Sequence, residues 1–179
     1  MRWLAKFVFF QIMGWKLESR FDTSIQKCVI IVAPHTSSWD FLIGILVRKI
    51  LNIHIDFIAK KELFRPPFGW YFKMVGGSPL DRTSNQKKVD AIAEMFQKKA
   101  VFRLAMSPEG TRQKTDRWKT GFYYIALKAE VPIVMVSFDF GKKMVRISEA
   151  FYPKNGLETD MAEIKSFYRG VQGKIPQNF

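Results

Sequence analysis

Residues 28–40 read CVIIVAPHTSSWD, and this stretch decides the fold. Its first six residues are apolar and mostly β-branched with no polar alternation, which is typical of a central strand covered on both faces of a parallel sheet. Pro34 ends that strand, and apolar residues at helical spacing follow from Trp39 to Leu51. A buried strand followed at once by a helix indicates an α/β architecture.

The rest of the chain continues this alternation. We expect strands over residues 53–59, 101–106, 131–140 and 144–147, and helices over 121–130, 161–168 and a segment capped by Ser84. No internal repeat, low-complexity segment or linker is visible. The sequence therefore predicts a single α/β domain with a mostly parallel sheet covered by helices, over residues 25–179, preceded by an N-terminal segment over residues 1–24.

Composition limits the classes of partner. Hydrophobic residues make up 47% of the 179 residues, which is enough for a core and excludes disorder as the dominant state. The net charge of +13 favours nucleic acid, acidic lipid headgroups or phosphorylated substrates, and composition alone does not choose among them. The 17 Phe and 5 Trp suit an anionic membrane surface at least as well as DNA. A single cysteine, Cys28, excludes an intramolecular disulfide.

The N-terminal residues 1–15 read MRWLAKFVFFQIMGW. Lys6 and Gln11 interrupt this apolar run well short of the roughly 20 residues that a membrane-spanning helix needs. No small-residue cleavage site of a signal peptide follows it. We expect an amphipathic helix in the headgroup layer, with Trp3 and Trp15 at the interface; the alternative is a helix packed on the protein's own core.

The titratable residues His35 and Asp40 follow the most apolar strand, where open α/β sheets place their ligands. Pro34 keeps His35 outside the helix, and Thr36 or Ser37 can cap it, which leaves Asp40 in the first turn. Asp40 can then orient the His35 imidazole, which acts as a general base. The alternative is a capping box, in which Asp40 only accepts hydrogen bonds from the backbone at the helix start.

Residues 107–112, SPEGTR, follow the strand predicted over 101–106. Gly110 lets the backbone approach a ligand closely, and the guanidinium of Arg112 suits phosphate oxygens. The alternative is a β-turn with Arg112 as a surface charge.

Two further basic positions are candidates for an anion site. Arg82 ends the stretch GGSPLDR over residues 76–82, and Lys61 ends the region of the strand predicted over 53–59. Arg82 could equally pair with Asp81 or face solvent, and Lys61 could serve solubility alone.

Taken in order, these segments resemble the glycerolipid acyltransferase family, which includes the lysophosphatidic acid acyltransferases. His35 and Asp40 match the family's H-x4-D motif, and the matches extend from Pro34 to about Val136. The other matching segments are residues 61–64 with 68–70, 77–82, 108–112 (PEGTR) and 131–134.

The resemblance implies roles for each block. His35 would be the general base and Asp40 its orienting partner. Acceptor binding would fall to the second and third blocks and the lysine before them, that is Arg82, Glu109, Gly110, Thr111, Arg112 and Lys61. Glu109 cannot bind phosphate directly, so we expect it to orient other groups. The 131–134 block would be architectural or line the acyl chain.

Two positions depart from the family pattern. Pro34 stands where an Asn often precedes the motif histidine, and Pro79 stands near a frequent aromatic residue. Neither change removes a reacting group. They leave the acceptor open to another lyso-lipid, such as one with an amino-acid head.

The resemblance thus implies an acyltransferase catalytic domain over residues 25–179. It would move an acyl group from acyl-CoA or acyl carrier protein to a lyso-glycerolipid hydroxyl, with 1-acylglycerol-3-phosphate as the expected acceptor, in phospholipid biosynthesis at the cytoplasmic side of the membrane. We expect peripheral or monotopic attachment to an anionic membrane surface, no metal or organic cofactor, and no acyl-enzyme, because Cys28 lies in a buried strand and residues 76–80 lack the closing Gly of G-x-S-x-G.

Two other classes of function stay open. A lipase or thioesterase would share the acyl substrate but transfer the acyl group to water. A nucleic-acid-binding module would use the same charge, although no zinc-finger spacing, RNP-like block or heptad-linked basic region is present, and we expect no nucleic-acid partner.

Overall fold

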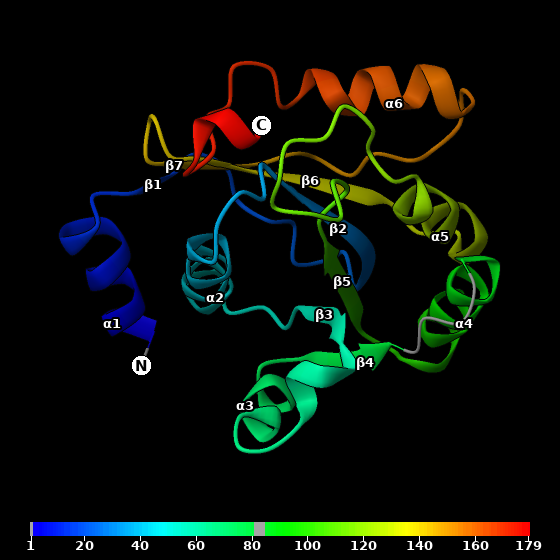
Figure 1. The fold of residues 1–179 in the computed structure, drawn as a ribbon, viewed down its shortest axis with the longest axis horizontal. Helices are drawn as coiled ribbons and strands as arrows, with labels where there is room; N and C mark the ends of the chain where they lie inside the picture. Colours follow the sequence, from blue (N-terminus) through cyan, green and yellow to red (C-terminus); the bar gives the residue numbers. More distant parts are fainter. Residues whose placement is uncertain (1, 81–84) are drawn as a thin grey trace.

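The computed structural model describes residues 2–80 and 85–179, without the side chains of residues 59–61, 63, 79–80 and 85–87. Its strands form one seven-stranded sheet in the order β1-β7-β6-β2-β5-β3-β4 (Figure 1). All neighbouring strands run parallel except β6 and β7. The strands are β1 Lys16–Leu17, β2 Lys27–Ala33, β3 Asp56–Lys60, β4 Gly77–Leu80, β5 Phe102–Met106, β6 Ile133–Asp139 and β7 Met144–Ile147.

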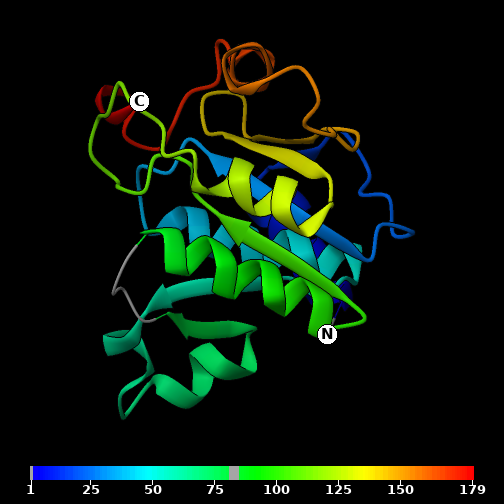
Figure 2. The ribbon, with the colours of Figure 1, turned by 90° about the vertical axis from the view of Figure 1, so that its right-hand side faces the viewer.

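Helices cover both faces of this sheet (Figure 1). One face carries α1 (Arg2–Lys6), the π-helix η1 (Phe7–Ile12) and α2 (Trp39–Leu51), and the other carries α4 (Asn85–Lys98), α5 (Gly121–Ala129) and α6 (Leu157–Ser166). Figure 2 shows α4 and α5 side by side, and α3 (Gly69–Met74) beyond the β4 edge. Two 3-10 helices complete the chain, η2 (Lys61–Phe64) and η3 (Pro176–Asn178).

The central strand β2 is buried on both sides, as its sequence predicts. Val29 and Ile31 pack in the core beneath α4, α5 and α6, whereas Cys28 and Ile30 pack in the core beneath α2. The predicted single α/β domain with a mostly parallel sheet is therefore confirmed.

Several element boundaries differ from the sequence-based expectation. Strand β3 begins at Asp56 rather than residue 53, and α6 begins at Leu157 rather than residue 161. Ser38 occupies the N-cap position of α2 but makes no side-chain capping hydrogen bond, whereas Ser37 Oγ accepts a hydrogen bond from the backbone N–H of Trp39 at 3.3 Å. The predicted cap at Ser84 lies outside the described residues.

The N-terminal segment combines the two alternatives. Trp3 is 70% exposed, as expected for an interfacial residue, but Trp15 is only 4% exposed. The prediction that Trp15 lies in the headgroup layer is wrong, because its ring packs edge-on against Phe140 at 4.8 Å and beside Phe9. Within residues 2–80 and 85–179, the helices are too short or too polar to cross a bilayer.

Candidate active site

The site lies where β2 and β5 end. These strands are parallel neighbours, so their carboxyl ends lie at the same edge of the sheet. The helix after β2, α2, covers one face, and the helix after β5, α5, covers the other. Adjacent loops that leave toward opposite faces open a crevice between them, which is where α/β sheets bind ligands.

His35 and Asp40 come together in this crevice. His35 Nδ1 lies 3.0 Å from Asp40 Oδ2, and the backbone N–H of Ser37 donates to the same oxygen at 2.9 Å. Asp40 therefore makes both contacts that the sequence left as alternatives, one to the helix start and one to the imidazole. The Asp40 side chain is 2% exposed and that of His35 is 28% exposed. A carboxylate acceptor at Nδ1 places the imidazole proton there and leaves the Nε2 lone pair free to take a proton.

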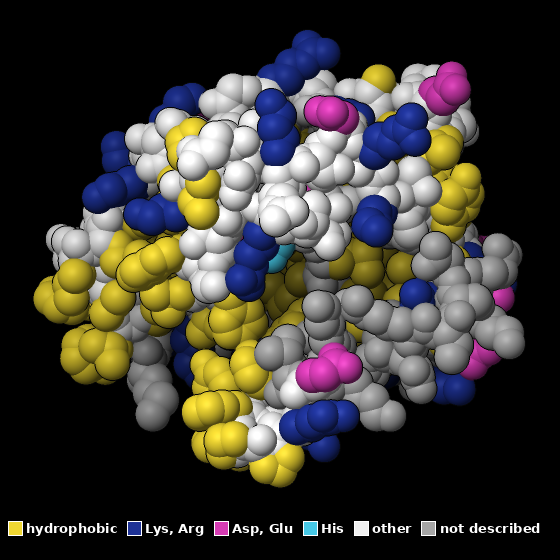
Figure 3. Space-filling view, viewed as in Figure 1, with side chains coloured by type: hydrophobic (Ala, Val, Ile, Leu, Met, Phe, Trp, Pro, Cys, Tyr) yellow, Lys and Arg dark blue, Asp and Glu magenta, His cyan; other side chains and the backbone are white. Residues whose placement is uncertain are grey.

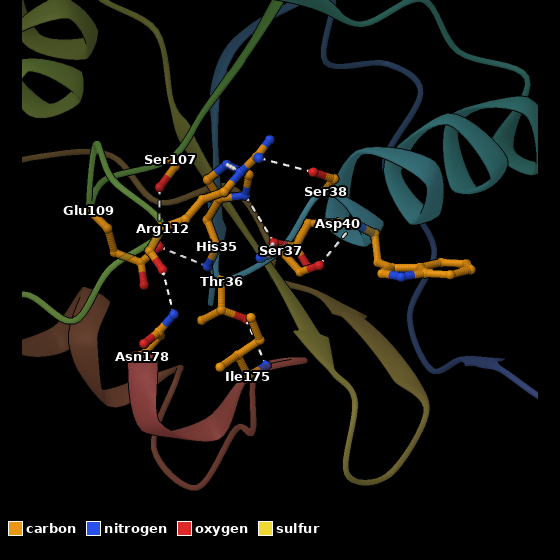
Figure 4. A network of polar contacts seen from close by, with 11 residues as sticks. His35, Thr36, Ser37, Ser38, Asp40, Ser107, Glu109, Arg112, Ile175 and Asn178 are labelled. Carbon is orange, nitrogen blue, oxygen red and sulfur yellow. Dashed lines mark hydrogen bonds and ion pairs between the residues drawn. The ribbon is translucent and has the colours of Figure 1, made fainter.

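Arg112 lies beside that free nitrogen (Figure 4). Its Nε points at His35 Nε2 over a long 3.5 Å contact, and one terminal N–H donates to Ser38 Oγ at 2.9 Å. Both partners belong to the loop after β2, although Arg112 belongs to the loop after β5. The exposed guanidinium therefore places a permanent positive charge at the edge of the dyad.

Glu109 connects the loop after β5 to the loop after β2. Its Oε2 accepts a hydrogen bond from the backbone N–H of His35 at 2.8 Å and another from Ser107 Oγ at 3.1 Å. The side chain is buried, and this burial raises the pKa of Glu109 above its ordinary value, while the hydrogen bonds from His35 and Ser107 act in the opposite direction. These contacts orient the loop of His35.

The other predicted binding residues are placed less directly. Gly110 has φ +66°, a conformation that glycine adopts without strain. Thr111 Oγ1 accepts a hydrogen bond from the N–H of Gln113, within its own loop. The side chain of Lys61 and all of Arg82 lie outside the described part of the chain.

Sequence reasoning missed some contacts of the site. Ser38 was not singled out as a partner of Arg112, and nothing pointed to Thr36 or Asn178 as contacts of residues far along the chain. Within residues 2–80 and 85–179, no group of three or more His, Cys, Asp or Glu side chains could hold a metal ion. The expected absence of a metal or cofactor stays a prediction.

An apolar cavity of about 250 Å³ opens at the dyad. His35, Asp40 and Ser107 contribute to its lining, which continues along α2 through Gly44 and Arg48 to Leu51. Residues 40 to 51 of a helix span roughly 16 Å at 1.5 Å per residue. In Figure 3 the centre of this face is hollowed and lined by hydrophobic side chains, with a histidine and basic groups at its edge. The site thus joins a polar, cationic rim to an apolar interior.

Comparisons with known proteins identify the family of this chain. The Acyltransferase family model matches residues 16–139. A 1-acyl-sn-glycerol-3-phosphate acyltransferase of Streptococcus pneumoniae is 36% identical over 110 residues, which is 61% of this chain and 40% of that protein. The Saccharomyces cerevisiae enzyme of the same name is 30% identical over 151 residues, 75% of this chain and 48% of its own.

The fold has a counterpart among solved structures. The 1-acyl-sn-glycerophosphate acyltransferase PlsC of Thermotoga maritima superposes with a TM-score of 0.58 at 21% identity, over 96% of this chain and 80% of that one. The chain spans about half the length, or less, of the curated relatives it matches, for example 40% of the Streptococcus pneumoniae enzyme and 48% of the Saccharomyces cerevisiae enzyme.

Proposed function

Because this chain belongs to the acyltransferase family, we propose that it transfers a fatty acyl group from an acyl thioester to the hydroxyl of a lyso-glycerolipid, with 1-acylglycerol-3-phosphate as the acceptor. One observation carries the proposal: the His35–Asp40 dyad lies at the mouth of an apolar cavity with Arg112 beside it. The names of the curated relatives support the same acceptor.

The dyad supplies a general base. His35 Nε2 takes the proton of the acceptor hydroxyl as its oxygen attacks the thioester carbonyl. A carbon–oxygen bond forms, the carbon–sulfur bond breaks, and the proton on Nε2 passes to the departing thiolate. Asp40, held by the Ser37 N–H, keeps the ring in the required tautomer and stabilises the imidazolium that forms. Cys28 is fully buried in β2 and is therefore no candidate nucleophile, and in the proposed mechanism the transfer runs directly, with no acyl-enzyme.

Arg112 is suited to the phosphate of the acceptor. Its guanidinium offers a planar fork of donors that matches phosphate oxygens. In this structure Arg112 Nε occupies the place beside His35 Nε2 that the acceptor hydroxyl needs. A phosphate that draws the guanidinium toward itself would leave that place free for the hydroxyl. Arg82 and Lys61 stay candidates for the same phosphate.

The cavity is suited to the acyl chain. It starts at the dyad and follows α2 between that helix and the sheet, with Phe41, Ile45 and Val136 among its lining residues. Burial of each methylene contributes about 0.8 kcal/mol. A chain seated here would hold the thioester carbonyl close to His35. We leave acyl-CoA and acyl carrier protein as alternative donors.

One experiment tests the reaction and its acceptor. Purified protein is incubated with labelled acyl-CoA and, separately, with lysophosphatidate, other lyso-phospholipids and lyso-lipids with amino-acid heads, and each product is identified by mass. We expect phosphatidate as the product, formed more slowly by His35→Ala by about 10²- to 10⁴-fold. If only a lyso-lipid with an amino-acid head gave product, that lipid and not lysophosphatidate would be the acceptor. Free fatty acid with no dependence on acceptor would identify a thioesterase or lipase instead.

We also propose that the protein docks on an anionic membrane surface, at its cytoplasmic side. Hydrophobic side chains gather over α1 and α3 on the face that holds the hollow (Figure 3). The exposed ones are Trp3 (70%), Leu4 (48%), Phe7 (50%), Phe68 (68%), Trp70 (67%) and Met74 (64%). Exposed Lys6, Arg65 and Lys73 alternate with them, as cations do at a headgroup layer.

Vesicle sedimentation tests this docking. We expect binding to vesicles of phosphatidylglycerol and phosphatidylcholine, weakened in Trp3→Ser and in Trp70→Ser. Leu127→Ser is the matched control, because Leu127 is a hydrophobic residue, 43% exposed, on α5 and thus on the opposite face of the sheet. Equal binding by all three variants would contradict the proposed surface.

A further inference from the structure

The segment over residues 172–178 comes after α6 and lies against the loop that carries His35 (Figure 4). The backbone N–H of Ile175 donates to Thr36 Oγ1 at 3.2 Å, and Thr36 is 2% exposed. The packing is close at Gly173, where a β-carbon would lie 2.8 Å from both γ atoms of Thr36. The residue next to His35 is therefore held by a distant part of the chain.

The same segment holds the loop that carries Arg112. Asn178 Nδ2 donates to the backbone carbonyl of Arg112 at 3.0 Å, across 66 residues of sequence. Residues 107–120 form no helix or strand, so the hydrogen bonds of regular structure do not fix the backbone there. The side chain of the same residue, Arg112, contacts Ser38 and His35 (Figure 4).

We propose that Asn178 is a positioning residue that fixes the backbone of Arg112 and so determines how well the site binds the phosphate of its acceptor. This inference rests on the proposed function, in which Arg112 binds that phosphate. A guanidinium binds phosphate through a fixed fork of N–H groups, so a small displacement of its backbone costs bidentate geometry. The Asn178 side chain donates to Arg112 rather than to the dyad, and Asn178 is not among the residues that line the cavity, so we expect it to affect acceptor binding and not the acyl donor.

Steady-state kinetics of Asn178→Ala test the proposal. A hydrogen bond of net strength about 1 kcal/mol sets the scale, and we expect the acceptor KM to rise roughly three- to tenfold. The kcat and the KM for acyl-CoA should stay near wild type. Asn178→Gln, which keeps the amide donor, should restore part of the acceptor affinity. Gln177→Ala, at the exposed neighbouring residue, is the matched control and should behave as wild type. An unchanged acceptor KM in Asn178→Ala would overturn the proposal.

A double-variant cycle separates positioning from a general structural role. If Asn178 acts through Arg112, then Asn178→Ala should have no further effect on acceptor KM in an Arg112→Ala background. The same fold-change in both backgrounds would mean that Asn178 supports the fold rather than Arg112, and would refute the positioning role.

Amide hydrogen exchange gives a readout that needs no substrate. We expect amides of residues 109–113 to exchange faster in Asn178→Ala than in wild type, and to be unchanged in Gln177→Ala. If wild-type protein forms no product with lysophosphatidate, the proposed acceptor fails while this exchange still decides the positioning role. Equal exchange in wild type and Asn178→Ala would overturn it.

Discussion

Replacing Asp40 with Asn removes the charge of the dyad while keeping its shape. In the structure one oxygen, Oδ2, accepts from both His35 and the Ser37 N–H. The Asn side chain can keep its carbonyl oxygen at this position, because the Ser37 N–H requires an acceptor there. The ring therefore stays oriented, and the change acts on the charge that faces the imidazolium.

The distance between the two groups sets the size of the effect. At the observed 3.0 Å separation, the attraction of two unit charges is about 1.4 kcal/mol in water and about 5.5 kcal/mol at an effective dielectric of 20. The Asp40 side chain is buried but that of His35 is 28% exposed, which places the pair between these limits. If Asp40→Asn removes about 3 kcal/mol of this attraction from the transition state, kcat falls roughly a hundredfold.

The assay measures kcat with saturating acyl-CoA and lysophosphatidate. Asp56→Asn is the matched control, because Asp56 is also a buried carboxylate in an ion pair, with Lys99, but begins β3 at the opposite edge of the sheet. We expect Asp56→Asn to lower the Tm and leave kcat near wild type. A folded Asp40→Asn variant with kcat within about threefold of wild type would refute the general-base assignment, since that role contributes about 10²- to 10⁴-fold.

Three further predictions concern buried groups of the site and the sheet. Burial raises the pKa of Glu109 above its ordinary value of 4.5. The stability of wild type relative to Glu109→Gln should therefore be greatest below pH 4.5 and decline as the pH rises through the raised pKa. A Tm difference between the two proteins that stays constant from about pH 4 to 8 would contradict this. Burial raises the pKa of the Cys28 thiol to about 12, so its alkylation at pH 8 should follow unfolding, and rapid labelling of folded protein would contradict this. Gly44 lines the cavity, and a β-carbon there would lie 3.9 Å from the Phe138 ring. Gly44→Leu should therefore shift the preference toward shorter acyl-CoA donors, more than Gly44→Ala does. An unchanged chain-length profile would contradict the proposal that the cavity holds the acyl chain.

The sequence by itself determined the parts of this protein that depend on neighbouring residues. The apolar run of residues 28–33 predicted the central strand, because a strand buried on both faces needs no polar alternation. The pairing of His35 with Asp40 was also predictable, since a proline before the helix and an acidic residue in its first turn set that geometry within six residues. The segments that resemble the glycerolipid acyltransferase family, taken in their order along the chain, predicted the family that the comparisons confirm.

Only the tertiary structure decided the contacts between distant segments. Arg112 meets His35 across 77 residues because β5 lies beside β2 in the sheet, and periodicity does not specify strand order. Trp15 is buried because Phe140 packs on it, although its own segment resembles an interfacial helix. Local sequence fixes backbone conformation and the apolar faces of elements, whereas the partner that covers each face depends on how the whole sheet assembles.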